Sequence, residues 1–300
     1  MSASRPTPDE RRHLFGVAYR ILGSVHDAED AVQEGIARWW ALTDDQRPLV
    51  REPIAWLTRV VSRICLDELA SARSRRETYT GMWLPEPILG SLPASAAPRD
   101  GRDPADAVTL DEQVSIALLV AMETLTPGER VSLILHDVFG MPFDEVGAVV
   151  GRSAASCRQL ASTARRKVRD TEAAGAAERG RDEVVAAFLA ACAGGDLDAL
   201  VRLLDPAVVS RADGGGHVRT ARKEIVGAET VARYLLNVVG KQEQRTTRLV
   251  ASIEPVNGRT GIVARDEGRV IGVFDLEIVG GRITQIAILV NPEKLRERLG

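Results

Sequence analysis

The chain has 300 residues, 45% of them hydrophobic, and a formal net charge of −3. This length exceeds what one hydrophobic core usually organises, so two or three domains are expected. No apolar run is long enough to span a bilayer and the N-terminus lacks a secretory apolar stretch, so we expect a cytoplasmic protein. The three cysteines, Cys65, Cys157 and Cys192, lie far apart in helical patterns, which predicts core thiols and no metal site or disulfide.

Residues 1–80 predict a bundle of three helices. Thr7-Pro8-Asp9-Glu10 has the form of a capping box with proline at the first helical position. Two further apolar stripes follow, one opened by Ser24 and one by Pro53. The second helix is acidic on one side, and the third ends in the basic residues Arg73, Arg75 and Arg76. The three stripes can cover one another and form a single core.

Residues 81–108 predict a linker, because prolines gather there among alanine, serine and glycine. We expect this segment to be extended and solvated. Helical periodicity returns in residues 109–173, which form a second all-α domain with a capping box at Thr126-Pro127-Gly128-Glu129. Residues 181–300 begin with helices and continue, beyond Gly240, with four β-branched segments separated by Asn-Gly or Gly-Gly turns. This order predicts an α+β third domain.

The segment from Phe143 to Arg169 has the proportions of a helix-turn-helix, with Gly151 at the corner and Ser153 as a cap. Its second helix is basic and has no acidic residue before Asp170, which favours a polyanion. The start of such a helix reaches base edges, and its far end reaches phosphates. The predicted DNA contacts are Arg152, Ser156, Arg158, Gln159, Ser162, Arg165, Arg166, Lys167 and Arg169. The alternative is a basic amphipathic helix that shows its charge to water.

The first domain carries aromatic and basic residues suited to single-stranded DNA, since rings stack on unpaired bases and arginines follow the backbone. The predicted contacts there are Trp56, Arg59, Arg63, Arg73, Arg75 and Arg76. Core packing is the alternative for the tryptophans, and for Trp39 it is the preferred interpretation.

These patterns together resemble the extracytoplasmic-function branch of the sigma-70 superfamily. Residues 27–34 resemble the region 2 helix that docks on the polymerase clamp, which implies polymerase contacts at Asp27, Asp30, Gln33 and Glu34. Residues 55–67 resemble the promoter-melting helix, and residues 110–169 resemble region 4, which reads the upstream −35 element. Many relatives carry asparagine where Arg63 stands, so base choice at the −10 element is not carried over.

Three short motifs resemble the subgroup with a fused SnoaL-like extension, in which the extension modulates the sigma domains in place of a separate anti-sigma protein. They are Trp83-Leu84-Pro85-Glu86-Pro87, Asp213-Gly214-Gly215-Gly216-His217 and Asn291-Pro292-Glu293-Lys294-Leu295. Lysine is commoner in relatives where His217 stands. The resemblance implies a multidomain protein of two helical sigma domains and a cone-shaped, nuclear transport factor 2-like domain. These fifteen residues are the predicted regulatory and interdomain contacts.

The predicted function is therefore that of an alternative sigma factor whose partners are core RNA polymerase and promoter DNA, with no cofactor and no membrane. Three alternatives stay open. The third domain could be an enzyme using Asp213, His217, Asp275 and Glu277, although no nucleophile and base are recognisable by spacing, so no catalytic residue is predicted. It could sense a small-molecule ligand in an apolar pocket. An ordinary helix-turn-helix repressor is disfavoured by the acidic second helix.

Overall fold

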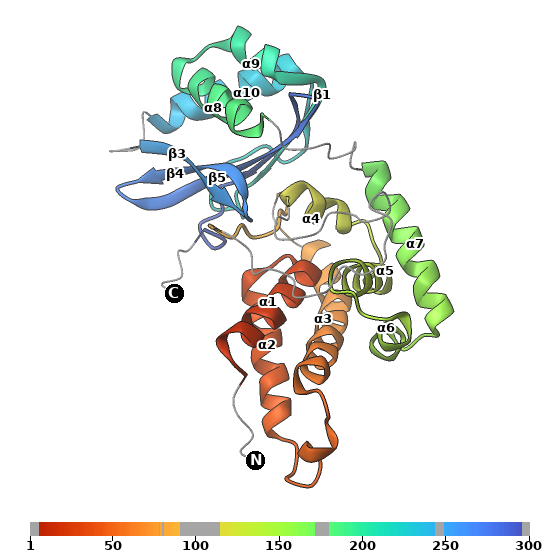
Figure 1. Cartoon of the computed structure of the whole chain (residues 1–300). Coiled ribbons are helices and arrows are strands. Elements are labelled where there is room, and N and C mark those ends of the chain that lie inside the picture. Colours follow the sequence, from red (N-terminus) through yellow and green to blue (C-terminus); the bar gives the residue numbers. More distant parts are fainter. Residues whose placement is uncertain are drawn as a thin grey trace. The chain divides into compact units, whose positions relative to one another are not determined.

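The computed structural model describes residues 6–77, 79, 81–90, 115–171, 180–243 and 249–295 (Figure 1). The chain divides into two compact units. Unit 1 comprises residues 1–77, 92–114 and 121–171, and unit 2 comprises residues 78–91, 115–120 and 172–300. Across the described residues, no helix is long and apolar enough to cross a membrane, and no cluster of side chains suits a metal ion.

In the described residues of unit 1, all regular elements are helices. Its elements are α1 (Pro8–Leu22), α2 (Val25–Trp40), η1 (Arg47–Leu49), α3 (Pro53–Glu77), α5 (Pro127–Leu133), the π-helical turn η2 (Ile134–Val138), α6 (Phe143–Val150) and α7 (Ala154–Thr171). Both predicted capping boxes form, at Thr7 with Glu10 and at Thr126 with Glu129. Helix α4 (Ile116–Met122) is shared, because its residues up to Val120 belong to unit 2.

Unit 2 is an α+β domain around one six-stranded sheet. Its elements are α8 (Arg181–Gly194), α9 (Leu197–Leu203), β1 (Leu204–Asp213), β2 (Ile225–Val226), α10 (Ala228–Glu243), β3 (Leu249–Val256), β4 (Arg259–Asp266), β5 (Arg269–Val279) and β6 (Arg282–Leu289). The strand order is β2-β1-β6-β5-β4-β3. Strands β1 and β6 are parallel and the other neighbours are antiparallel. The hairpin strands β3 to β6 follow the predicted segments, whereas β1, β2 and α10 were not predicted.

The sheet of unit 2 is covered on both faces. Since side chains alternate along a strand, neighbouring residues of β6 belong to different clusters. Ile286 and Ile288 pack with the helices α8, α9 and α10, which Figure 1 shows over one face. Ala287 and Leu289 pack on the second face.

The second face is covered by segments from outside the predicted third domain. Its apolar cluster combines sheet residues with Leu84 and Ile116, which are both 0% exposed, and with Leu295 from the C-terminal motif. Leu89 also forms an antiparallel bridge with Val256. The expectation of a solvated linker is therefore wrong for residues 84–90. Burial of the Leu84 side chain against the apolar face of the sheet is more favourable than its exposure to water.

Candidate functional site

The helix-turn-helix is formed by α6 and α7. Gly151 joins them in the left-handed conformation at φ +72°, and the Ser153 hydroxyl accepts the Ser156 N–H at 3.2 Å. Cys157 and Val168 face inward. The predicted readers on the opposite side are solvent-accessible: Arg152, Arg158, Gln159, Ser162 and Arg166 are exposed, and Ser156 is half-buried. The Arg158 guanidinium lies 5.2 Å from the centre of the Phe143 ring, which steadies it at the start of the helix.

Two of the residues predicted to contact DNA, Arg165 and Lys167, also have partners within the fold. Arg165 binds Asp137 through two hydrogen bonds of 2.6 and 2.7 Å, and the Asp137 side chain is 3% exposed. Lys167 donates to both carboxylate oxygens of Glu129, at 2.8 and 2.9 Å. These two contacts hold α7 against α5 and η2, and both side chains stay partly exposed, at 22% for Arg165 and 39% for Lys167. The Arg169 side chain lies outside the described residues.

The Lys167 contact has an electrostatic consequence for Glu129. Burial alone would raise the pKa of this carboxyl group. The hydrogen bonds from Lys167 and from the N–H and hydroxyl of Thr126 outweigh burial and lower the pKa below its ordinary value. Glu129 is therefore a charged cap that orients α5 and holds α7 at the same time.

The acidic face predicted on α2 is present. Asp30 and Glu34 are exposed and lie near the basic side chains His26 and Arg38 of the same helix, and Gln33 is exposed beside them. Asp27 is half-buried, and its N–H is capped by Ser24. The side chains of Asp30, Gln33 and Glu34 are therefore accessible to a protein partner.

The tryptophans of unit 1 have different surroundings. Trp39 is buried, as preferred from the sequence, and its ring lies 5.5 Å from that of half-buried Trp56. Trp40 is 40% exposed. Trp56 thus combines a contact with a core residue and partial exposure. The side chains of Arg73, Arg75 and Arg76 lie outside the described residues.

In unit 2 the three predicted regulatory motifs meet in one cluster, which we call the linker anchor: Tyr79, Trp83, Leu84, Asp213, Gly215, Asn291 and Lys294. The Asp213 carboxylate, fully buried, accepts hydrogen bonds from the Tyr79 hydroxyl at 2.7 Å and the Leu84 N–H at 2.9 Å. Lys294 donates to Asp213 at 2.7 Å and to the Leu84 carbonyl at 2.6 Å. The motifs are therefore parts of one contact, centred on a buried ion pair.

Aromatic and backbone features complete the linker anchor. The Lys294 ammonium lies 4.4 Å from the centre of the Trp83 ring and 4.9 Å from that of Tyr79. Gly215 has φ +61°, and a Cβ at this position would lie 2.4 Å from Asn291. Only glycine permits this approach. Burial and the Asp213 contact raise the pKa of Tyr79, which keeps its hydroxyl a hydrogen-bond donor.

Other motif residues have smaller roles. Pro85 is buried, and Glu86 and Pro87 are half-buried. Gly214 is buried, Gly216 is exposed, and Pro292 is exposed at the start of the C-terminal turn. His217 is exposed and lies 3.4 Å from Glu293.

The carboxylates considered for catalysis each have a basic partner. Asp213 binds Lys294, Asp275 lies 3.3 Å from Arg181, and Glu277 lies 3.1 Å from Arg259. A small pocket beside Asp275 and Glu277 is lined also by Leu84, Ala117 and Val120. The sequence predicted neither the burial of Arg181 beside Asp275 nor the contact of residues 115–120 with the sheet.

The sequence of this chain matches two protein-family models and several known proteins. Residues 9–75 match the model of sigma-70 region 2, and residues 115–168 match that of sigma-70 region 4. The ECF RNA polymerase sigma factor SigJ of Mycobacterium tuberculosis is 46% identical over 231 residues, covering 76% of this chain and 70% of SigJ. The probable ECF RNA polymerase sigma factor SigI of the same species is 38% identical over 303 residues, covering 97% and 94%. The chain belongs to the ECF RNA polymerase sigma factors.

The crystal structure of SigJ matches this sigma factor along almost its whole length. The TM-score is 0.71 at 36% identity, and the match covers 95% of each chain. The fold of helical sigma domains followed by a SnoaL-like domain is therefore confirmed. Which residues contact DNA or polymerase stays a prediction.

Within unit 1 the sigma factor's region 2 and region 4 pack against each other. Arg63 of α3 donates to the Val149 carbonyl of α6 at 2.9 Å, and Arg59 lies 3.8 Å from Glu145. Both arginines belong to the predicted DNA contacts of region 2. In this arrangement both arginines are engaged by the first helix of the helix-turn-helix.

At the same interface, the surroundings of His13 predict that the stability of unit 1 depends on pH. Its ring lies edge-on to Phe139 at 5.4 Å, and its Nε2 lies 3.3 Å from the Thr58 hydroxyl. Burial and then the nearby charge of Arg20 lower the pKa of His13 below 6.5. The unfolded chain thus binds more protons than the folded chain near pH 6, and stability is lost as pH falls below about 6.5 through the lowered pKa.

We expect chemical denaturation at pH 7.5 and pH 5.5 to show a larger loss of unfolding free energy for wild type than for His13→Gln. His26→Gln is the matched control, because His26 is exposed on α2. Equal losses in wild type and His13→Gln would show that His13 does not carry the pH dependence.

Proposed function

We propose that this ECF sigma factor contacts core RNA polymerase through the acidic face of α2, opens DNA with α3, and reads the upstream −35 element with the start of α7. As a member of its family the protein directs promoter-specific transcription initiation, and its SnoaL-like domain modulates that activity. The observation that supports the reader assignment is the exposed row Arg152, Arg158, Gln159 and Ser162 opposite the buried face of α7. Arginine and glutamine suit guanine and adenine edges.

The proposed modulation operates through the linker anchor. Residues 79–90 leave region 2 and bind the SnoaL-like domain through Asp213 and Lys294, so the domain holds the chain at the point where region 2 ends. In unit 1, Arg59 and Arg63 are meanwhile engaged by α6. We infer that this state has reduced access to DNA and that release of region 4 from α3 accompanies promoter binding.

The first test is run-off transcription from a promoter pool with core polymerase and the full chain. Truncation before the SnoaL-like domain is a poor comparison, because it would expose Leu84 and Ile116. Glu34→Lys is expected to reduce specific transcripts at least about tenfold, since charge reversal at an interface costs more than about 1.4 kcal/mol. Asp198→Lys, an exposed acidic site on α9, is the control. Equal yields from the two variants would contradict the proposed polymerase face.

A further inference from the structure

Both ends of the segment that joins region 2 to region 4 are held by the SnoaL-like domain. Leu84, before this segment, and Ile116, after it, are each 0% exposed and belong to one apolar cluster with Val263, Val273 and Leu289. Residues 85–115 therefore start and end at the same place on the sheet.

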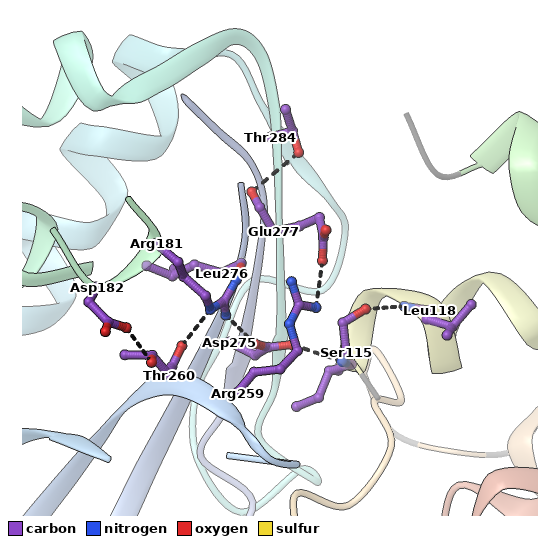
Figure 2. Close-up of polar contacts among 11 residues, drawn as sticks. Ser115, Leu118, Arg181, Asp182, Arg259, Thr260, Asp275, Leu276, Glu277 and Thr284 are labelled. Atoms are coloured by element: carbon purple, nitrogen blue, oxygen red, sulfur yellow. Dashed lines mark hydrogen bonds and ion pairs between the residues drawn. The ribbon is translucent and has the colours of Figure 1, made fainter. Parts of the chain in front are cut away.

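The second of these attachments includes a hydrogen bond from Ile116 to Asp275, and Figure 2 shows the polar contacts around Asp275. Asp275 on β5 is 4% exposed, and its Oδ2 accepts the Ile116 N–H at 2.8 Å. Its Oδ1 faces Arg181, which also donates to the carbonyls of Thr260 and Leu276. The carboxylate is thus fixed by a buried cation and presents a charged acceptor to a buried backbone donor, a strong type of hydrogen bond.

The first residues of region 4 fit this site through their local structure. The Ser115 hydroxyl accepts the Leu118 N–H at 2.9 Å and caps the helix, while Asp275 satisfies the N–H of the next residue (Figure 2). Ala117 and Val120 line the small pocket beside Asp275 and Glu277. The SnoaL-like domain therefore binds a specific segment of its own sigma portion.

This double attachment changes the effective length of the connection. Fully extended, residues 85–115 would reach about 100 Å. Because Leu84 and Ile116 are held in one cluster, residues 85–115 add no reach between region 2 and region 4. We propose that Asp275, together with the linker anchor, restricts the separation of region 2 from region 4 and thereby selects the spacer length between the two promoter elements. This inference rests on the proposed function of the two regions.

The test uses the full chain and a promoter chosen from the pool, remade with spacers one and two base pairs shorter and longer. Each base pair changes the length by about 3.4 Å. Ile116→Pro removes the N–H that binds Asp275, and proline suits the first position of a helix. On the promoters with altered spacers, we expect this variant to give about tenfold more transcript than wild type. The reason is that the loss of a hydrogen bond to a charged group weakens the attachment that restricts the two regions. Ile116→Val is the control for side-chain packing.

A second measurement leaves both attachments intact. A flexible Gly/Ser insertion between Pro98 and Arg99 lengthens only the part of the chain between the two attached residues. In wild type we expect the insertion to leave the preferred spacer unchanged, whereas in Ile116→Pro we expect it to broaden spacer tolerance further. Should Ile116→Pro fail to fold, Asp275→Asn takes its place, with Glu277→Gln as control because Glu277 binds Arg259 instead of residues 115–120.

The outcomes separate the two proposals. If wild type yields no specific transcript from any promoter, the proposed function fails. If wild type transcribes but the insertion alone shifts its preferred spacer, or if Ile116→Pro and Ile116→Val have the same spacer profile, the spacer inference is overturned. An equal effect of Asp275→Asn and Glu277→Gln would likewise overturn it, since general loosening of the sheet would then explain the result.

Discussion

Asp213→Ala is expected to destabilise the SnoaL-like domain by about 3–5 kcal/mol, because it leaves the Lys294 ammonium buried without its carboxylate. It also removes the acceptor of the Tyr79 hydroxyl and the Leu84 N–H. The measurement is chemical denaturation monitored by the fluorescence of Trp83, whose ring contacts Lys294. The other three tryptophans are replaced by phenylalanine in both proteins that are compared.

The double variant Asp213→Asn with Lys294→Met provides the control for Asp213→Ala. Removing both charges avoids an unpaired buried ion, so the double variant is expected to lose less stability than Asp213→Ala. A loss in Asp213→Ala below about 1 kcal/mol would place the pair among ordinary surface ion pairs and would contradict its role in the linker anchor.

Arg158→Glu is expected to reduce the preference for the correct base at one position of the −35 element by about 10- to 100-fold. The reason is that a good contact to a base edge is worth about 1–3 kcal/mol. Arg166→Gln should instead weaken binding to all sequences and reduce the salt dependence by about one ion. Transcription from matched and single-base-altered promoters, at several salt concentrations, measures both effects.

The control for Arg158 separates its two contacts. Phe143→Leu removes the ring beneath the guanidinium while Arg158 remains, so it should retain sequence discrimination. If Arg158→Glu and Arg166→Gln lost only general affinity, the assignment of Arg158 as a base reader would be wrong.

Local signals in the sequence predicted much of the fold. Thr7 with Glu10 and Thr126 with Glu129 form the expected capping boxes, since such boxes depend on residues three apart. Strand β1 was missed because Pro206 and the polar residues after Val209 hide its alternation. The long-range contacts of α7 were also beyond reach: Arg165 and Asp137 are 28 residues apart, and only packing brings them together.

The attachment sites show the same limit in the candidate site. The motifs around Asp213 and Lys294 were recognised as a group, but their partner Tyr79 lies before the recognised motif. Leu84 is one apolar residue in a proline-rich stretch, so no periodicity marks it as buried. The role of Asp275 could not be predicted, because the backbone N–H that it accepts belongs to Ile116, 159 residues away.

The burial of all three cysteines makes this sigma factor convenient for site-specific labelling. Burial raises the pKa of Cys65 and Cys157, and raises that of Cys192 to about 12. Thiols react with maleimides and other electrophiles as thiolates, so the native cysteines should react slowly while the protein is folded. A single cysteine introduced at an exposed position such as Ala155 would then carry a dye selectively, and motion of α7 on promoter DNA could be followed in the otherwise native chain.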